Sequence, residues 1–191
     1  YVPEGGRHVG PTVITHRLAV APGTKLSAIA NLSGELSHAL GRTDDNPVRV
    51  AGSTVEVSRL DRQTTVLSDL MQRPEWRKLG ASLPVALGVH PTGEAVYVDL
   101  DQCPHLLLAG TTGSGKSVGL NVMLTSLLLT YTPRDMRLLL IDPKRVELSK
   151  YREIPHLLRP IACEISDAID ILTWAAGEMD RRYTLFEAHD A

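Results

Sequence analysis

The residues most able to do chemistry stand together in Gly110 to Ser117, which reads GTTGSGKS and matches the phosphate-binding pattern GxxxxGK[ST]. Gly113 and Gly115 are expected to take positive φ angles, so that successive backbone N–H groups turn inward around an anion. Lys116 is expected to reach the β and γ phosphates, and the Ser117 hydroxyl to ligate the Mg²⁺ that bridges them. The pattern therefore indicates a nucleoside triphosphate as the first ligand to consider.

The predicted site is the loop together with the start of the segment that follows it. Lys116 is the predicted catalytic residue and Ser117 the predicted metal ligand, whereas the other polar residues of the loop contribute mainly backbone groups. The full predicted nucleotide-binding set is Gly110, Thr111, Thr112, Gly113, Ser114, Gly115, Lys116, Ser117 and Val118.

The segments around the loop have the order that this motif requires. His105 to Ala109 (HLLLA) is a short apolar run typical of a buried parallel strand. Lys116 to Thr130 is long and mostly apolar and predicts a helix, whose N-terminal N–H groups and dipole would add attraction for phosphate. Strand, glycine loop and helix together favour a phosphate site over a chance glycine-rich turn.

Two later segments extend this pattern. Arg137 to Ile141 (RLLLI) predicts a second buried strand, and Ser166 is the expected N-cap of a final helix. The order strand, helix, strand, helix indicates an α/β domain with a parallel sheet flanked by helices. One stripe of the final helix is apolar and holds Ala168, Ile169, Leu172, Ala175, Ala176, Met179, Tyr183 and Phe186.

The first part of the chain reads as a small α+β module. Thr12 to Ala21 alternates like a strand, and Lys25 to Leu40 repeats apolar residues at helical spacing. Val48 to Val57, interrupted by Gly52, predicts two short strands or a bulged hairpin, and Thr65 to Trp76 a short helical or mixed segment.

A hairpin is expected next, with strands at Val85 to Val89 and Ala95 to Leu100 around the turn Pro91-Thr92-Gly93-Glu94. It leads directly into the predicted strand before the glycine loop. We therefore place the domain boundary near Leu83, with the α+β module at 1–83 and the nucleotide-binding domain at 84–191.

Composition excludes several other classes. The net charge of −2 and pI of about 6.4 show no basic excess of the kind usual for a dedicated nucleic-acid-binding domain. Cys103 and Cys163 lack metal or redox spacing, which favours a reducing compartment, and the seven histidines show no metal-type spacing. No apolar run approaches membrane-spanning length. Because the chain begins at Tyr1 and ends without a closing signal, we read it as an excerpt of a longer protein.

The run Leu138 to Asp142 (LLLID) has two interpretations. Its terminal Asp142 could hold Mg²⁺ as a Walker B residue, a position that suits the carboxyl end of a parallel strand. Asp142-Pro143 is equally a common start of a turn. The residues alone leave both open.

Four segments, in order, resemble the FtsK/SpoIIIE motor domain of bacterial double-stranded DNA translocases. They are Pro104 to Val118 (PHLLLAGTTGSGKSV), Ile141 to Leu148 (IDPKRVEL), Ile154 to Leu158 (IPHLL) and Glu178 to Tyr183 (EMDRRY). The opening is similar to the small α subdomain before that motor core, at Gly10-Pro11-Thr12-Val13, Ala21-Pro22-Gly23 and Asn31-Leu32-Ser33. The resemblance covers almost the whole chain.

The resemblance implies a partial RecA-like core that binds ATP and Mg²⁺. LLLID is then not Walker B, which would lie beyond Ala191 with other catalytic residues, so the chain alone is expected to have negligible ATPase activity. Asp142 and Lys144 could still face the nucleotide or a neighbouring subunit, or belong to a plain turn.

The resemblance also implies partners. Family members work as homo-hexameric rings around duplex DNA, so mild acidity does not exclude DNA. Four arginines could form a collar that faces DNA or be ordinary solvated charges: Arg42, Arg49, Arg59 and Arg62. The chain would lie on the cytoplasmic face, with a tether to the inner membrane supplied from outside it.

Two other function classes remain as alternatives. Type VII protein-secretion ATPases use related modules, although an aromatic residue and glycines usually follow the Asp where this chain has Pro143-Lys144. A small-molecule kinase or GTPase would need LLLID to be Walker B and the chain to be nearly complete.

Overall fold

The computed structural model describes residues 2–3, 5–43, 46–103 and 105–189 of the chain. Its internal contacts form two compact units, Tyr1–Ala109 and Gly110–Ala191. Pro104, the first residue of one quoted segment, lies outside the described residues, as do the outer ends of the two predicted domains. The domain boundary near Leu83 stays a prediction.

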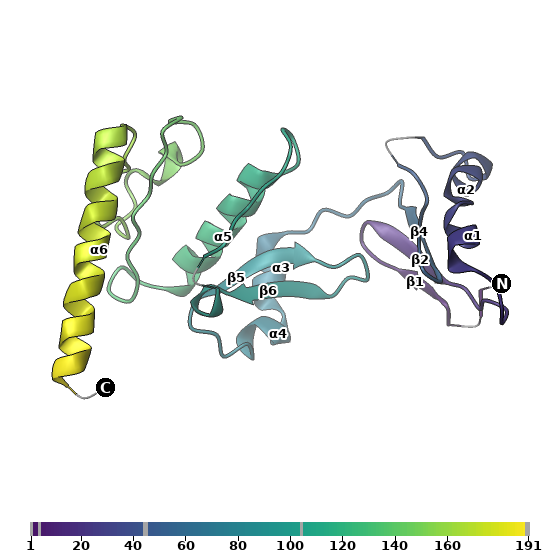
Figure 1. Ribbon diagram of the computed structural model, residues 1–191, viewed down its shortest axis with the longest axis horizontal. Helices are drawn as coiled ribbons and strands as arrows, with labels where there is room; N and C mark the ends of the chain where they lie inside the picture. Colours follow the sequence, from purple (N-terminus) through teal and green to yellow (C-terminus); the bar gives the residue numbers. More distant parts are fainter. Residues whose placement is uncertain (1, 4, 44–45, 104, 190–191) are drawn as a thin grey trace. The chain divides into compact units, whose positions relative to one another are not determined.

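The first unit begins with an antiparallel sheet in the order β1-β2-β4-β3 (Figure 1). Its strands are β1 (Arg7–Val9), β2 (Val13–Arg17), β3 (Arg49–Ala51) and β4 (Thr54–Ser58). Val48, Val55 and Val57 form the small core of this sheet. Leu36, which lies in the helix Ser33–Ala39, packs against them. Val48 to Val57 was predicted to form two short strands or a bulged hairpin, and the two short strands are observed. They are β3 and β4, which pair antiparallel around Gly52, whose φ of 60° turns the chain.

Two short helices lie on one face of this sheet (Figure 1): α1 (Leu26–Ala30) and α2 (Ser33–Ala39). The prediction of one continuous helix over Lys25 to Leu40 is thus wrong, because the segment forms two helices. Leu32 N–H bonds to the carbonyl of Ile29, three residues back, at 3.1 Å, so the helical ladder changes register there. The sequence Asn-Leu-Ser-Gly at this point is rich in weak helix formers.

The rest of the first unit is a helical pair and a hairpin. The helices are α3 (Leu67–Gln72) and α4 (Pro74–Arg77), and the hairpin pairs β5 (Pro84–Val89) with β6 (Ala95–Asp99), as predicted. The ring of Trp76 meets that of Tyr97 edge to face at 5.2 Å, and the Tyr97 hydroxyl donates to the Leu70 carbonyl at 2.7 Å. A 3₁₀ helix, η1 (Leu100–Gln102), follows.

The second unit contains α5 (Lys116–Thr130), a 3₁₀ helix η2 (Ser149–Tyr151) and α6 (Ile165–Ala188) (Figure 1). Between α5 and α6 the chain runs parallel to itself, through isolated bridges Leu138↔Leu157 and Ile141↔Ala162. The core is formed by Leu124 of α5 together with Leu140, Leu148 and Tyr151. The predicted strand at Arg137 to Ile141 is therefore reduced to isolated parallel bridges at Leu138 and Ile141, and no continuous strand forms there.

The predicted strand at His105 to Ala109 does not form in this structure. These residues have no strand pairing, and the side chain of Leu107 is 90% exposed. An apolar run becomes a buried strand only where neighbouring strands bond its backbone and cover its side chains. Among the described residues, none pairs with this run.

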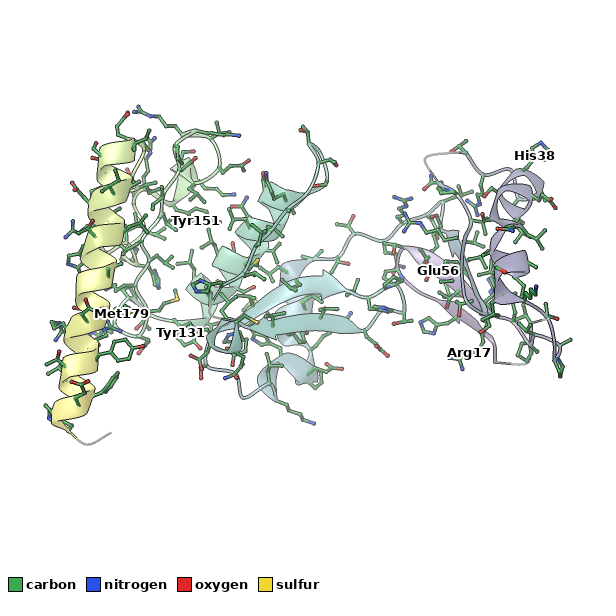
Figure 2. All side chains as sticks on the ribbon, in the orientation of Figure 1. Arg17, His38, Glu56, Tyr131, Tyr151 and Met179 are labelled. Carbon is green, nitrogen blue, oxygen red and sulfur yellow. The ribbon has the colours of Figure 1, made fainter. Side chains whose placement is uncertain are left out.

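The final helix differs from its prediction in two ways. Its N-cap is Glu164 and not Ser166, and no side chain caps it. Its buried residue is Ile171, whereas the large members of the predicted apolar stripe are exposed, including Met179, labelled in Figure 2. The packed face of α6 is thus the one that carries Ile171 and Trp174, whose ring lies 5.3 Å below the Arg159 guanidinium.

Candidate nucleotide site

The glycine loop has the backbone conformation that the sequence predicts. Gly113 has a φ of 80° and Gly115 a φ of 90°, angles that side-chain-bearing residues rarely adopt. Gly115 is the N-cap of α5, so the loop passes directly into the helix N-terminus at Lys116. Backbone N–H groups at such a terminus lack helical partners and favour an anion.

The loop encloses a hollow of about 440 Å³, which is within the range of roughly 300–1,000 Å³ typical of small-molecule sites. We call it the cradle. Two chain segments contribute its lining residues, which are Gly110, Thr111, Thr112, Gly113, Gly115, Lys116, Ser117, Val118, Lys144 and Glu147. Every residue of the predicted binding set except Ser114 therefore meets at one place.

Ser114 instead closes the loop on itself. Its N–H donates to the carbonyl of Thr111 at 3.1 Å. A Cβ placed on Gly110 would lie 2.3 Å from the Ser114 hydroxyl oxygen, so only glycine fits there without a shift. Ser114 thus shapes the cradle and does not line it.

Asp142 is engaged in its own loop. Its side chain is buried, and its carboxylate oxygen Oδ2 accepts the N–H groups of Glu147 at 3.1 Å and Leu148 at 2.9 Å. Its backbone carbonyl accepts the N–H of Arg145 at 3.0 Å, and Arg145 has a φ of 57°. Of the two interpretations of LLLID, the structure therefore favours the turn.

That turn brings two charged side chains to the cradle, Lys144 and Glu147. The Ser117 hydroxyl donates to Glu147 Oε1 at 2.6 Å. Sequence reasoning assigned no role to Glu147, although it lies within the quoted segment IDPKRVEL. The sequence does place the Glu147 carboxylate five residues after Asp142, a residue that can start a turn. That spacing points to a role at the cradle only when the folded turn is known to bring Glu147 beside Ser117.

Further contacts hold the same two segments together. Leu148, next to Glu147, is buried in the core with Leu124. The hydroxyl of Tyr151 donates to Asn121 Oδ1 at 2.9 Å. Tyr151 is labelled in Figure 2. The Asp142 turn before Glu147 and these contacts after it hold the backbone on both sides. The carboxylate of Glu147 therefore has a defined position at the cradle, beside Ser117.

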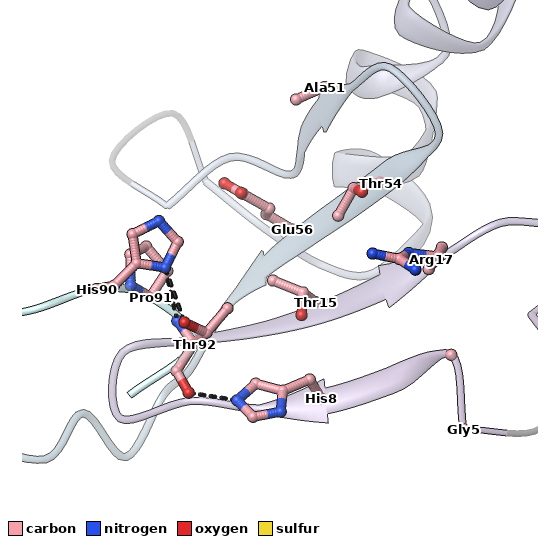
Figure 3. Close-up of a pocket in the computed structure, with 11 residues that line it drawn as sticks. Gly5, His8, Thr15, Arg17, Ala51, Thr54, Glu56, His90, Pro91 and Thr92 are labelled. Carbon is pink, nitrogen blue, oxygen red and sulfur yellow. Dashed lines mark hydrogen bonds between the residues drawn. The ribbon is translucent and has the colours of Figure 1, made fainter. Parts of the chain in front are cut away.

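A second hollow, of about 490 Å³, lies in the first unit (Figure 3). A ring nitrogen of His8 contacts the Thr92 carbonyl, and Nδ1 of His90 bonds the Thr92 hydroxyl at 2.8 Å. Arg17 and Glu56 also line it. Both histidines thus hold the hairpin turn at Thr92, and we assign this hollow no ligand.

Two of the four arginines considered for a DNA collar have partners inside the chain. Arg59 Nε donates to Asp61 at 3.0 Å and its Nη1 to the Gly10 carbonyl at 3.0 Å. The hydrogen bond with Asp61 raises the pKa of Arg59 above its ordinary value. Arg62 contacts the Asn46 side chain. These contacts favour a structural role for both arginines.

In the described part of the chain, no group of three or more His, Cys, Asp or Glu side chains is arranged to hold a metal ion. No helix in that part is long and apolar enough to cross a membrane.

The chain resembles known proteins along most of its length. It is 43% identical over 187 residues to the DNA translocase FtsK of Vibrio parahaemolyticus, which covers 96% of this chain and 18% of the relative. It is 42% identical over 184 residues to the DNA translocase FtsK of Haemophilus influenzae, covering 94% of this chain and 35% of the relative. The chain therefore spans about a third or less of these relatives' lengths.

A solved structure shares the fold. The pCW3 conjugation coupling protein TcpA, in its monomer form with ATPγS, matches with a TM-score of 0.54 at 19% identity, covering 95% of this chain and 49% of that one. This match confirms the predicted α/β fold class. The family model described as FtsK/SpoIIIE matches residues 66–191, about two thirds of the chain. The chain belongs to the FtsK/SpoIIIE family.

Proposed function

We propose that this chain is the ATP-binding part of an ATP-driven motor that moves double-stranded DNA. The observation that carries the proposal is the cradle, where the GTTGSGKS loop and the IDPKRVEL segment meet around one hollow. The relatives named DNA translocase FtsK support it, because they match nearly the whole chain at 41 to 43% identity.

The residues of the cradle fit a nucleoside triphosphate. The two positive-φ glycines and the N-terminus of α5 direct N–H groups toward an anion, and Lys116 and Lys144 add positive charge. We assign phosphate binding to residues 110–118, with Lys116 as the catalytic residue that neutralises charge on the β and γ phosphates. The TcpA structure described with ATPγS supports this choice of ligand.

The cradle also fits Mg²⁺. Hard divalent cations prefer oxygen ligands, and the Ser117 hydroxyl and the Glu147 carboxylate are oxygen groups 2.6 Å apart at the edge of the phosphate loop. When bound, Mg²⁺ would offset the negative charge of the phosphates. Ser117 is the residue of this chain that would hold it.

We extend the proposal to the whole protein. It would act as a homo-hexameric ring around duplex DNA, at the cytoplasmic face, with an inner-membrane tether outside this chain. Among the described residues that line the cradle, Glu147 is the one carboxylate, and it is bonded to Ser117. We therefore propose that the chain alone hydrolyses little ATP.

The alternative functions have less support. A small-molecule kinase or GTPase would need the Asp142 carboxylate to hold Mg²⁺. In this structure the carboxylate instead accepts hydrogen bonds from the N–H groups of Glu147 and Leu148 in its own loop. A type VII secretion ATPase shares the module, but the relatives from Vibrio parahaemolyticus and Haemophilus influenzae are named as DNA translocases.

The experiment that tests the proposal measures ATP hydrolysis by the full-length protein with and without linear duplex DNA. We expect duplex DNA to stimulate hydrolysis strongly and Lys116→Ala to abolish the stimulated rate. Hydrolysis unaffected by duplex DNA would contradict the assignment as a DNA motor.

A further inference from the structure

The bond between Ser117 and Glu147 has a consequence for the metal. A serine hydroxyl has one proton to donate and two lone pairs that can accept a proton or a cation. The Ser117 proton is committed to Glu147 Oε1 at 2.6 Å, a short bond of the charge-assisted kind. The lone pairs of the Ser117 oxygen therefore face away from Glu147 and are available to a cation.

The position of Glu147 is set independently of any ligand. Its N–H is held by Asp142 at 3.1 Å, and the next residue, Leu148, is buried in the core. Its side chain is half-buried, so its charge is only partly screened by solvent. Glu147 is thus a fixed negative charge beside a phosphate cradle.

A negative charge at this place acts with opposite sign on two ligands. It repels the phosphate oxygens of metal-free ATP, and it attracts a divalent cation that arrives with the nucleotide. Lys116 and Lys144 attract both forms, and they attract metal-free ATP more strongly because it carries more negative charge. Among the described residues that line the cradle, Glu147 is the side chain whose charge favours the Mg²⁺ complex.

We propose that Glu147 makes nucleotide binding selective for the Mg²⁺ complex, by orienting the Ser117 hydroxyl toward the cation and by disfavouring metal-free ATP. Glu147 is a positioning residue in this account and acts through Ser117. The inference rests on the proposed function, because it assumes that the cradle binds a nucleoside triphosphate.

The test measures the affinity of the full-length protein for a fluorescent, slowly hydrolysed ATP analogue, mant-ATPγS, in Mg²⁺ and in EDTA. For the natural sequence we expect tighter binding in Mg²⁺. Glu147→Gln keeps the size of the side chain and an acceptor oxygen but removes the charge. It should bind better in EDTA, and the ratio of the two dissociation constants should fall by about tenfold, the scale of one charge at short range.

Two matched variants separate charge from structure. Glu147→Asp retains the charge and should retain most of the Mg²⁺ preference. Glu153→Gln makes the same chemical change at an exposed position outside the cradle lining and should leave the ratio unchanged.

The outcomes distinguish this inference from the proposed function. An unchanged ratio in Glu147→Gln, or an equal loss in Glu147→Gln and Glu147→Asp, would overturn the inference while nucleotide binding stands. No binding of mant-ATPγS by the natural sequence in either condition would overturn the proposed function together with the inference.

Discussion

The Tyr151 hydroxyl donates a hydrogen bond of 2.9 Å to the side-chain oxygen of Asn121. Asn121 lies four residues after Ser117 on α5, and Tyr151 lies four residues after Glu147. Because residues four apart share a helix face, the bonds of Ser117 and Asn121 lie along one side of α5. The segment that follows Asp142 is therefore joined to α5 by two side-chain hydrogen bonds, one at Ser117 and one at Asn121.

Removing the hydrogen bond between Tyr151 and Asn121 should lower the stability of the second unit without leaving a cavity in its core. Tyr151→Phe keeps the buried ring but loses the hydroxyl, so we expect a loss of about 0.5–1.5 kcal/mol in the free energy of unfolding. Urea unfolding followed by Trp174 fluorescence, in a Trp76→Phe background, measures it. A stability equal to that of the unsubstituted background protein would show that the bond contributes nothing.

The Asp142 turn should matter more. Asp142→Ala leaves the N–H groups of Glu147 and Leu148 without their acceptor, and a buried group left unsatisfied costs about 1–3 kcal/mol. The same urea experiment measures the change, with exposed Asp170→Ala as the control expected within about 0.5 kcal/mol of the starting protein. Equal stabilities for the two variants would contradict the structural role of Asp142.

Two neighbouring residues of α6 should respond very differently to truncation. Ile171 is 5% exposed and Leu172 is 61% exposed. We expect Ile171→Ala to destabilise the second unit by about 2–4 kcal/mol and Leu172→Ala to change it by less than about 0.5 kcal/mol. Thermal or urea unfolding compares them, and a reversed order would show that α6 packs by its other face.

Glu178 should stay ionised to unusually low pH. Hydrogen bonds from Arg181 at 2.7 Å and Arg182 at 2.8 Å lower the pKa of its carboxyl to about 2. Because the folded pKa lies below the ordinary value of 4.5, the ion pairs stabilise the helix fully above about pH 4.5. That contribution is lost as the pH falls from there through about 2.

NMR titration of the Glu178 side-chain carboxyl measures the midpoint directly. Arg181→Gln should move it back toward 4.5, since that arginine makes the largest contribution. A midpoint near 4.5 in the unsubstituted protein would show that the ion pairs do not form in solution.

Local patterns in the sequence were enough to predict several elements. Helix α5 was predicted over Lys116 to Thr130 and has those bounds, because a glycine loop starts it and Thr132-Pro133 follows it. The positive φ angles of Gly113 and Gly115 followed from the chemistry that a phosphate loop requires.

Other features depend on partners that local patterns do not reveal. The run at His105 to Ala109 has strand composition, but a strand also needs a neighbour to bond its backbone. The apolar stripe predicted on the final helix identifies an apolar face, but it does not say which residues cover that face. Glu147 reaches Ser117 across thirty positions of sequence, through a turn held by Asp142, and no spacing rule anticipates that contact.

The most direct measurement of the central proposal is triplex displacement by the full-length protein, in which a motor that moves along duplex DNA strips off a bound third strand. We expect displacement that requires ATP and Mg²⁺ and that is lost in Lys116→Ala. Displacement that proceeds equally without ATP, or that survives Lys116→Ala, would contradict the account, as would a full-length protein that hydrolyses ATP and displaces nothing.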